Sequence, residues 1–212
     1  MAIIIPSILE KTVEDFETIF RKVSTIPEID RIHVDFCDGV FVDNTTMTID
    51  DLTQLSPAYS WEAHLMVKQP DNFLDYKLPG FDSVIIHYEA YPSEDIHQVL
   101  RGIAAAGLKV GMAINPETPV TVLGNYLEGI SFAVIMAIHP GRQGNPFIEQ
   151  TYERVRLAKE LYPSMQIEID GSVNKLTIGK LKQCGADVLN CGSSLVKQPN
   201  IRVAYDELKQ LI

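Results

Sequence analysis

The sequence has few cysteines and no long apolar run, and each absence excludes a class of protein. Its three cysteines, Cys37, Cys184 and Cys191, are odd in number and show no C-x-x-C spacing. This pattern indicates neither a disulfide framework nor a zinc ribbon, so we expect buried free thiols. No apolar stretch approaches the roughly 18 residues that a membrane span requires. The amino-terminal run "MAIIIPSILEK" lacks the features of an export signal, and we expect a cytoplasmic protein without a membrane partner.

Positive charge is also scarce. The 212 residues include 18 lysines and arginines against 28 aspartates and glutamates, which gives a net charge of -10. No basic cluster interrupts this excess, and the balance argues against nucleic acid and anionic membranes as partners. A small anionic substrate would therefore need local capture by backbone amides or by a metal ion.

Short apolar runs alternate with amphipathic segments of helix length along the whole chain. The apolar runs cover residues 3–9, 31–36, 60–67, 82–90, 108–115, 130–141, 165–172 and 186–194. The segments that follow them, each expected to form a helix, cover residues 12–24, 48–55, 70–78, 93–107, 119–127, 146–162, 174–185 and 200–212. Continuous apolar strands that alternate with helices indicate a parallel sheet covered by helices.

Eight such units can close into a barrel. The length lies near the lower end of the roughly 200 to 400 residues seen for that fold. An open doubly wound sheet is the alternative, but such sheets usually carry a G-x-G-x-x-G turn after the first strand, and here "PSILEK" follows instead. No linker or low-complexity tract interrupts the pattern. The sequence therefore predicts an α/β protein, a (β/α)8 TIM barrel, as a single domain over residues 1–212.

Five polar residues fall where the predicted strands end. His33 and Asp35 end the second strand, His64 the third, His87 the fourth and Asp170 the seventh. In a barrel of this type the catalytic groups lie at the carboxyl ends of the strands. All five therefore fall on the predicted catalytic rim.

Four of these residues form a set of metal ligands. His33 and Asp35 are two residues apart on one strand and therefore share a face. His64 comes from the neighbouring strand, and Asp170 would complete the set from the opposite side of the barrel opening. Nitrogen and oxygen ligands of this kind suit one divalent ion such as Zn, Mn, Fe or Co. A lone histidine is more often satisfied by a loop amide, but four coincident placements favour a metal.

The other histidines have no expected part in the site's chemistry. We interpret His87 as a residue that packs beside the ligands or supports them. His97 and His139 are expected at surface or loop positions.

Glycines collect in the loops after the last three strands, within "HPGRQGNPF", "DGS" and "CGSS". In barrels a phosphate site commonly forms there, where free N–H groups point at the anion. Gly141, Gly144, Gly171, Gly192 and Ser193 therefore form a candidate phosphate cradle. A single glycine would more simply be a turn residue.

A metal ion on one side of the barrel opening and a phosphate-binding site on the other suit a short sugar phosphate as substrate. The metal would polarise the carbonyl group of that sugar. Asp35 and Asp170 could then exchange a proton with the two faces of the carbon beside that carbonyl. Such chemistry needs no nucleophile, and the sequence shows no Ser-His-Asp or reactive-cysteine signature.

These residues resemble a known family. The stretches "IPSIL", "HVDFCDGVFV", "HLMV", "NPETPV", "MAIHPG", "EIDGSVN" and "ADVLNCGSS" are similar to those of ribulose-phosphate 3-epimerases along nearly the whole chain. The resemblance implies the (β/α)8 barrel and one divalent metal held by His33, Asp35, His64 and Asp170. It also implies a small phosphorylated ketose as substrate and a homo-oligomer.

The resemblance further implies an isomerase of the pentose phosphate pathway in carbohydrate metabolism. Asp35 and Asp170 would be its acid/base pair, and a 1,1-proton transfer through a 2,3-enediolate would interconvert D-ribulose 5-phosphate and D-xylulose 5-phosphate. Met66 and Met136 would form part of an apolar lid. The residues expected to contact the substrate are Ser7, His64, Met66, Met136, Gly141, Gly144, Asp170, Gly171, Gly192 and Ser193.

The chain departs from the family's usual pattern at a few positions near the site. Cys37, Val40 and Asp43 replace a usual Met, His and Pro, and Arg142 stands in a phosphate loop that has lost one glycine. Ser172 after Asp-Gly resembles the allulose-6-phosphate 3-epimerase branch. Epimerisation of a hexulose 6-phosphate such as D-allulose 6-phosphate, and a barrel that binds sugar phosphates without catalysis, are the alternative functions.

Overall fold

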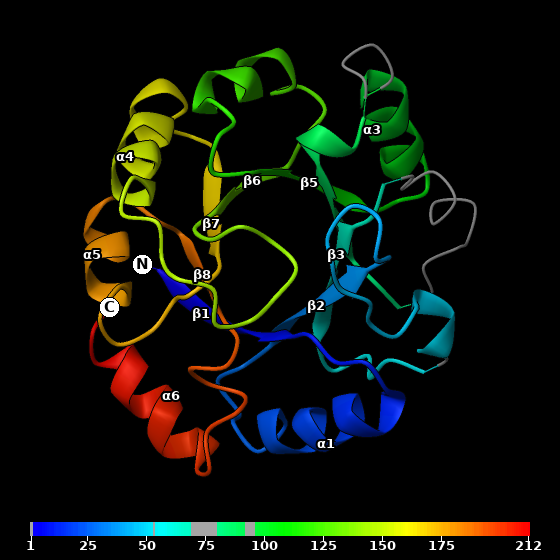
Figure 1. Cartoon of the computed structure of the whole chain (residues 1–212), viewed down its shortest axis with the longest axis vertical. Helices are drawn as coiled ribbons and strands as arrows, with labels where there is room; N and C mark the ends of the chain where they lie inside the picture. Colours follow the sequence, from blue (N-terminus) through cyan, green and yellow to red (C-terminus); the bar gives the residue numbers. More distant parts are fainter. Residues whose placement is uncertain (1, 53, 69–79, 92–95) are drawn as a thin grey trace.

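The computed structural model describes residues 2–52, 54–68, 80–91 and 96–212, and it shows a closed barrel of parallel strands ringed by helices (Figure 1). The strands are β1 (Ile3–Ile8), β2 (Arg31–Cys37), β3 (Ser60–Met66), β4 (Ser83–His87), β5 (Lys109–Ile114), β6 (Phe132–Met136), β7 (Gln166–Asp170) and β8 (Val188–Cys191). Each strand pairs with the next one along the chain, and β8 closes the barrel against β1. The predicted (β/α)8 barrel is confirmed.

Helices follow most of the strands and cover the outside of the barrel (Figure 1). The α-helices are α1 (Val13–Val23), α3 (Ile96–Ala105), α4 (Thr151–Leu161), α5 (Ile178–Gln183) and α6 (Ile201–Lys209). Three short 3-10 helices are η1 (Ile49–Asp51), η2 (Tyr88–Ala90) and η3 (Val120–Asn125). The helix expected over 70–78, and the first residues of the one expected over 93–107, lie outside the described residues.

Two of the expected helices are shorter and tighter than the sequence pattern indicated. The described residues of these two segments, 48–52, 54–55 and 119–127, contain only η1 and η3. In η3 three β-branched residues in succession and Gly124 oppose a regular α-helix, because each lowers helix propensity. In η1 the Asp51 carboxylate accepts a hydrogen bond from the Thr48 N–H at 2.7 Å, a contact typical of a helix start. The backbone then leaves the helical region at Leu52 (φ -92°, ψ 78°), so the helix ends after one turn.

The α1 helix shows how local sequence sets the ends of an element. Thr12 is its N-cap, and the hydroxyl of Thr12 accepts a hydrogen bond from the Asp15 amide at 3.2 Å. Acidic residues occupy its first turn and basic residues its last, as the helix dipole favours. Phe16, Ile19 and Val23 lie on one face and are buried against the barrel.

The wall of the barrel separates the two largest parts of the described core. The larger part fills the space between the strands and the surrounding helices. A smaller cluster inside the barrel comes from β4, β5 and β6 and contains Ile85, Ala113, Phe132, Val134 and Met136. Gly111 makes this inner cluster possible, because a Cβ there would come within 2.6 Å of the Phe132 ring.

The opposite half of the barrel is polar inside. Strands β2, β3, β7 and β8 contribute the buried side chains of His33, Asp35, Glu62, His64, Glu168, Asp170 and Asn190. Burying so many polar groups is costly unless they are paired or bind a ligand. This half of the interior is therefore where a functional site is expected.

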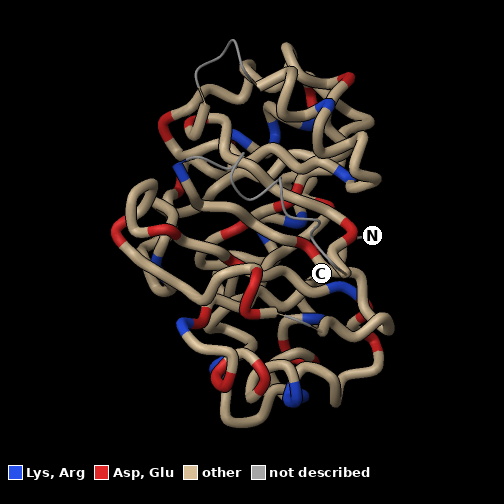
Figure 2. Tube along the Cα trace, turned by 90° about the vertical axis from the view of Figure 1, so that its right-hand side faces the viewer, with Lys and Arg blue, Asp and Glu red and all other residues tan. Residues whose placement is uncertain are grey.

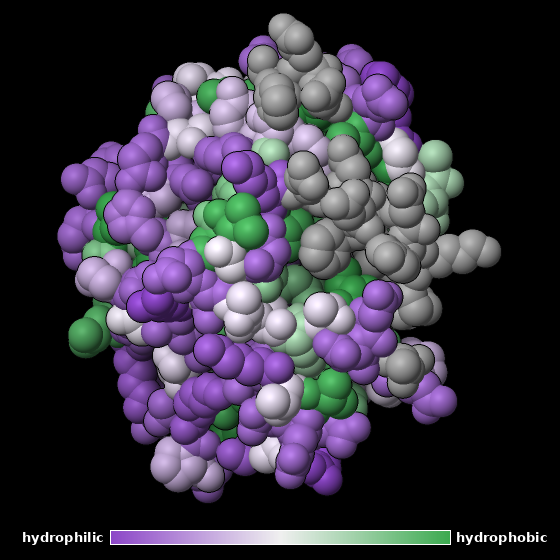
Figure 3. Space-filling model, turned by 45° about the vertical axis from the view of Figure 1, so that its right-hand side comes forward, coloured by the Kyte–Doolittle hydropathy of each residue, from purple (hydrophilic) through white to green (hydrophobic). Residues whose placement is uncertain are grey.

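The surface carries mixed charge. Figure 2 shows lysines and arginines scattered among aspartates and glutamates. On the face seen in Figure 3, apolar side chains form small separate patches within a hydrophilic surface. No helix in the described ranges has the length and apolar character needed to cross a membrane. All three cysteines are free and buried, as expected. The cellular location and the oligomeric state stay predictions.

Candidate active site

The four predicted ligand residues meet inside the barrel. Alternation along β2 turns His33 and Asp35 inward, while Ile32, Val34 and Phe36 pack outward against the helices. In the sheet register Asp35 lies beside His64 of β3, and Asp170 is the last residue of β7. One candidate ligand atom from each of the four lies within 4.8 Å of the others.

The atoms of this cluster lie at distances that a cation would bridge. His64 Nδ1 lies 2.8 Å from Asp35 Oδ1 and 3.6 Å from Asp170 Oδ2. His33 Nε2 lies 3.2 Å from Asp35 Oδ1 and 3.1 Å from His64 Nδ1. All four residues are at most 8% exposed. Two imidazole nitrogens and two carboxylates that converge in a buried space fit a divalent transition metal.

The surroundings move the proton affinities of the two aspartates in opposite directions. Burial raises the pKa of Asp35, but the charges and hydrogen bonds of His33 and His64 outweigh it and hold that pKa well below its usual range. Burial, and then the negative charge of Asp35, raise the pKa of Asp170 to about 6. Burial lowers the pKa of His33, but the neighbouring carboxylates raise it overall to about 10. Two carboxyl groups with separated pKa values are typical of an acid/base pair.

The raised pKa of Asp170 gives a prediction about stability in the absence of metal. An unfolded aspartate titrates near 3.8, so the proton held by folded Asp170 favours folding at low pH, and that contribution is lost as the pH rises through about 6. We expect Asp170→Asn to be more stable than the parent chain at pH 7.5, by on the order of 1–3 kcal/mol, with the difference vanishing near pH 4. Urea unfolding of both chains, with a chelator present, measures the difference in unfolding free energy at pH 7.5 and at pH 4. An equal difference at the two pH values would contradict the prediction.

His87 packs beside the cluster. Its ring stacks on that of His64, with the two Nε2 atoms 2.9 Å apart, and its Nδ1 lies 3.4 Å from Glu89 Oε2. Burial lowers the pKa of His87 to about 4, so the ring is neutral near pH 7. His97 lies exposed on α3, and His139 lies exposed in the loop after β6. These placements match the sequence interpretation.

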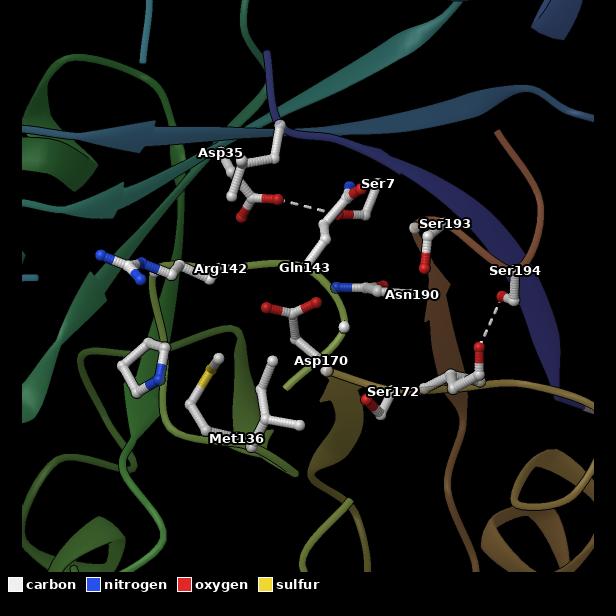
Figure 4. A pocket seen from close by; sticks show the side chains of 18 of the residues that line it. Ser7, Asp35, Met136, Arg142, Gln143, Asp170, Ser172, Asn190, Ser193 and Ser194 are labelled. Atoms are coloured by element: carbon white, nitrogen blue, oxygen red, sulfur yellow. Dashed lines mark hydrogen bonds between the residues drawn. The ribbon is translucent and has the colours of Figure 1, made fainter. Parts of the chain in front are cut away.

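A cavity opens directly above the cluster. It encloses about 490 Å³, including the part open to solvent. Ten of the predicted site residues line it: Ser7, Asp35, Met66, Met136, Gly141, Gly144, Asp170, Gly171, Gly192 and Ser193. His33 and His64 lie beneath its floor and are fully buried. Figure 4 shows the carboxylates of Asp35 and Asp170 facing each other within this space.

Sequence reasoning missed several residues that line the cavity. They are Leu9, Ile138, Pro140, Gln143, Ser172, Val173, Asn190 and Ser194. Asn190 could have been found from the alternation of β8, which turns it inward two residues before the Gly192 loop. Gln143 stands in the glycine loop after β6, and its Nε2 is buried without a hydrogen-bond partner in the described structure. A buried amide without a partner beside a cavity is suited to a ligand oxygen.

The loop of Gly171 shows why glycine is needed beside the cluster. Gly171 follows Asp170 with φ +104°, and a Cβ there would overlap the side chain of Ile138. Side chains rarely adopt this backbone region. We expect Gly171→Ala to destabilise the fold by about 2–4 kcal/mol and to displace Asp170 from the cluster. Thermal unfolding and turnover measure the two effects.

Gly102 provides the matched control for this substitution. It lies within α3, and a Cβ there would meet no atom within 4 Å. Gly102→Ala should stabilise the chain by roughly 0.5–1 kcal/mol, because alanine is the better helix former. Equal effects at the two glycines would contradict the role given to the Gly171 turn.

Two residues that depart from the family pattern pair with each other at the rim. Arg142 Nη2 lies 2.6 Å from Asp43 Oδ2 and also donates to the Asp43 carbonyl oxygen. Beside them Asn44 Nδ2 donates to the Gly141 carbonyl oxygen at 2.7 Å. The loops after β2 and β6 are thereby joined across the mouth. In Figure 4 Arg142 lies on the side of the cavity opposite Ser193, so its guanidinium serves this loop contact.

The chain is similar to proteins of known activity. It matches the model of the ribulose-phosphate 3 epimerase family over residues 3–196. The ribulose-phosphate 3-epimerase of Helicobacter pylori is 30% identical over 213 residues, which cover 97% of this chain and 96% of that one. The Aquifex aeolicus protein of the same name is 32% identical over 190 residues, or 86% and 85% of the two chains. The solved 3-hexulose-6-phosphate synthase of Salmonella typhimurium has a TM-score of 0.73 and 15% identity over 98% of this chain and 97% of that one, a likeness of fold alone.

Proposed function

The chain belongs to the ribulose-phosphate 3-epimerase family, and from that premise we propose that it interconverts D-ribulose 5-phosphate and D-xylulose 5-phosphate. One observation carries the proposal. Asp35 and Asp170 reach the same cavity from strands on different sides of the barrel, and their pKa values are shifted apart. Two such groups can serve opposite faces of one substrate carbon.

The residues present fit a divalent metal, and we propose that His33, Asp35, His64 and Asp170 hold one ion. Their donors converge, are buried and include two carboxylates. When bound, such an ion would polarise the substrate carbonyl and ease loss of the neighbouring proton by several kcal/mol. Zn, Mn, Fe and Co all suit this ligand set.

The proton transfer is assigned to the two aspartates. In one direction Asp35 removes the proton at C3, which leaves a 2,3-enediolate, and Asp170 returns a proton to the opposite face. In the reverse direction their roles exchange. Ser7 Oγ donates to Asp35 Oδ2 at 2.8 Å and orients that carboxylate. Met66 and Met136 line the cavity and are almost fully buried, so they can exclude water from the reacting carbon.

The phosphate group is assigned to the glycine side of the cavity. The loops that contain Gly144, Gly171 and Gly192 line it, and Ser193 lies beside them. Backbone N–H groups in such loops bind anions without a basic side chain. The partnerless Nε2 of Gln143 adds a donor that is free for a substrate oxygen. With these donors, a chain of net charge -10 would bind the substrate phosphate without a basic side chain.

Deuterium exchange tests the proposed activity directly. The metal-replete chain is incubated in heavy water with D-ribulose 5-phosphate, and separately with D-allulose 6-phosphate, while deuterium at C3 and the product epimer are followed. We expect exchange and epimerisation of the pentulose phosphate. Faster turnover of the six-carbon sugar would favour the hexulose alternative, and no exchange with either would leave only the binding alternative.

A further inference from the structure

A second group of buried charges lies beneath the candidate metal cluster, on the far side of His33. Glu62 of β3 and Glu168 of β7 are both fully buried inside the barrel. Arg31, at the start of β2, reaches them from the amino-terminal end of the barrel. None of these three residues takes part in the proposed proton transfer.

Arg31 is the positive centre of this group. Its guanidinium forms ion pairs with Glu62 and, at 3.2 Å, with Glu168, and it lies 5.5 Å from the centre of the Phe132 ring. Together with His33 the two glutamates resemble a ligand set, because one donor atom of each lies within 4.8 Å of the others. The guanidinium already supplies both carboxylates with a cation, so the group needs no second metal ion.

The two ring nitrogens of His33 face different surroundings. Nε2 faces the cluster, 3.2 Å from Asp35 Oδ1. Nδ1 lies 3.4 Å from both Glu62 Oε2 and Glu168 Oε1. A carboxylate can only accept a hydrogen bond, so these contacts place a proton on Nδ1. Asp35 Oδ1 would draw a proton to Nε2 in the same way, but a metal ion held by both atoms would take the place of that proton and use the Nε2 lone pair as a ligand.

On the Nδ1 side of the ring, Asn190 is a neighbour that could favour the opposite tautomer. Its Nδ2, which can only donate, lies 3.1 Å from His33 Nδ1. The same Nδ2 donates to Glu168 Oε1 at 2.7 Å, which is a shorter bond to a charged acceptor. The shorter bond makes Glu168 the stronger partner of the Asn190 amide, and Nδ1 keeps two carboxylates as acceptors.

We propose that Glu62 and Glu168, paired with Arg31, are positioning residues that keep the proton on His33 Nδ1 and so direct Nε2 at the metal. This inference rests on the proposed function, because the metal ion that His33 would bind is part of that proposal. Partners of this kind fix the tautomer and orientation of a ligand histidine, and losing one typically weakens metal binding by about 10–100-fold.

Zinc affinity without substrate is the first measurement, by competition with a chelator of known affinity. We expect Glu62→Gln and Glu168→Gln each to weaken zinc binding by about 10–100-fold, because a glutamine amide can donate to Nδ1 and stabilise the wrong tautomer. Ser83→Ala is the matched control. Ser83 Oγ donates to Glu62 Oε1 at 3.3 Å without touching His33, so its loss should change affinity less than about threefold.

The ¹⁵N spectrum of the zinc-loaded chain, labelled at histidine, is the second measurement. We expect a proton on His33 Nδ1 and zinc on Nε2. A proton-free Nδ1, or unchanged zinc affinity in both folded glutamine variants, would overturn the inference. If those variants do not fold, the spectrum of the parent chain decides. A chain that binds zinc as expected but epimerises no ketose phosphate would refute the proposed function and leave this inference standing.

Discussion

Replacing Asp170 by asparagine should lower kcat by about 10²–10⁴-fold, which is the range that a positioned acid or base contributes. The amide has the same shape but can neither take up nor release the proton that the mechanism assigns to this position. Asp170 is 8% exposed, and its Oδ2 lies 3.6 Å from His64 Nδ1. Because the carboxyl group is buried, bulk water has little access to act as the acid or base in its place. Steady-state turnover of D-ribulose 5-phosphate measures the loss.

The fold of this variant should be intact, because the substitution removes a carboxylate charge that is unfavourable when buried. The pKa of Asp170, raised to about 6, reflects that cost. Circular dichroism and thermal unfolding check this point. Asp50→Asn provides the control, since Asp50 is exposed in η1 and belongs neither to the cluster nor to the lining of the cavity. Full activity of the Asp170 variant, or an equal loss in both, would reject the assigned role.

Removal of metal should abolish turnover and lower thermal stability together. The four ligand residues are preorganised in the fold, so a bound ion stabilises the folded state alone. At a metal concentration about 1,000 times Kd that stabilisation reaches about 4 kcal/mol. Dialysis against a chelator, followed by assays of activity and Tm before and after adding Zn, Mn, Fe or Co, measures both effects. Undiminished turnover after complete metal removal would contradict the proposed metal dependence.

A pair of histidine variants separates loss of the ion from a general effect on the protein. His64→Ala removes a ligand that contacts both aspartates, and we expect it to lose metal binding and turnover together. His139→Ala removes an imidazole from an exposed loop after β6, where the side chain is 67% exposed. That variant should keep the metal, the activity and the Tm of the parent chain.

The sequence predicted the fold because periodicity is a local property. Each apolar run and amphipathic segment could be recognised without its neighbours, and eight repeats of that unit indicate a barrel. The elements that differed lie at 48–55 and 119–127. In 119–127 β-branched residues and Gly124 compete with a regular helix, and in 48–55 the backbone leaves the helical region at Leu52. Such competition depends on packing that a pattern of apolar residues does not contain.

The sequence also pointed to the four residues of the candidate ligand set that the structure brings together. A strand alternates its faces, so His33 and Asp35 had to point the same way, and the ends of parallel strands meet at one rim. His64 and Asp170 follow from the same rule. Four polar residues on buried strands are conspicuous because burial of each is costly without a partner.

What the sequence alone determined is therefore what repeats locally: the alternation of strands and helices, and the strand ends that bear the candidate ligands. Only the tertiary structure decided which distant residues meet. It paired Arg142 with Asp43, turned Gln143 into the cavity, and placed Glu62 and Glu168 beneath His33. The physical reason is that such contacts depend on closure of the barrel and on loop conformation. These bring together side chains that are 137 positions apart, as with Arg31 and Glu168, or 157 apart, as with His33 and Asn190. No short-range pattern in the sequence contains contacts between residues so far apart.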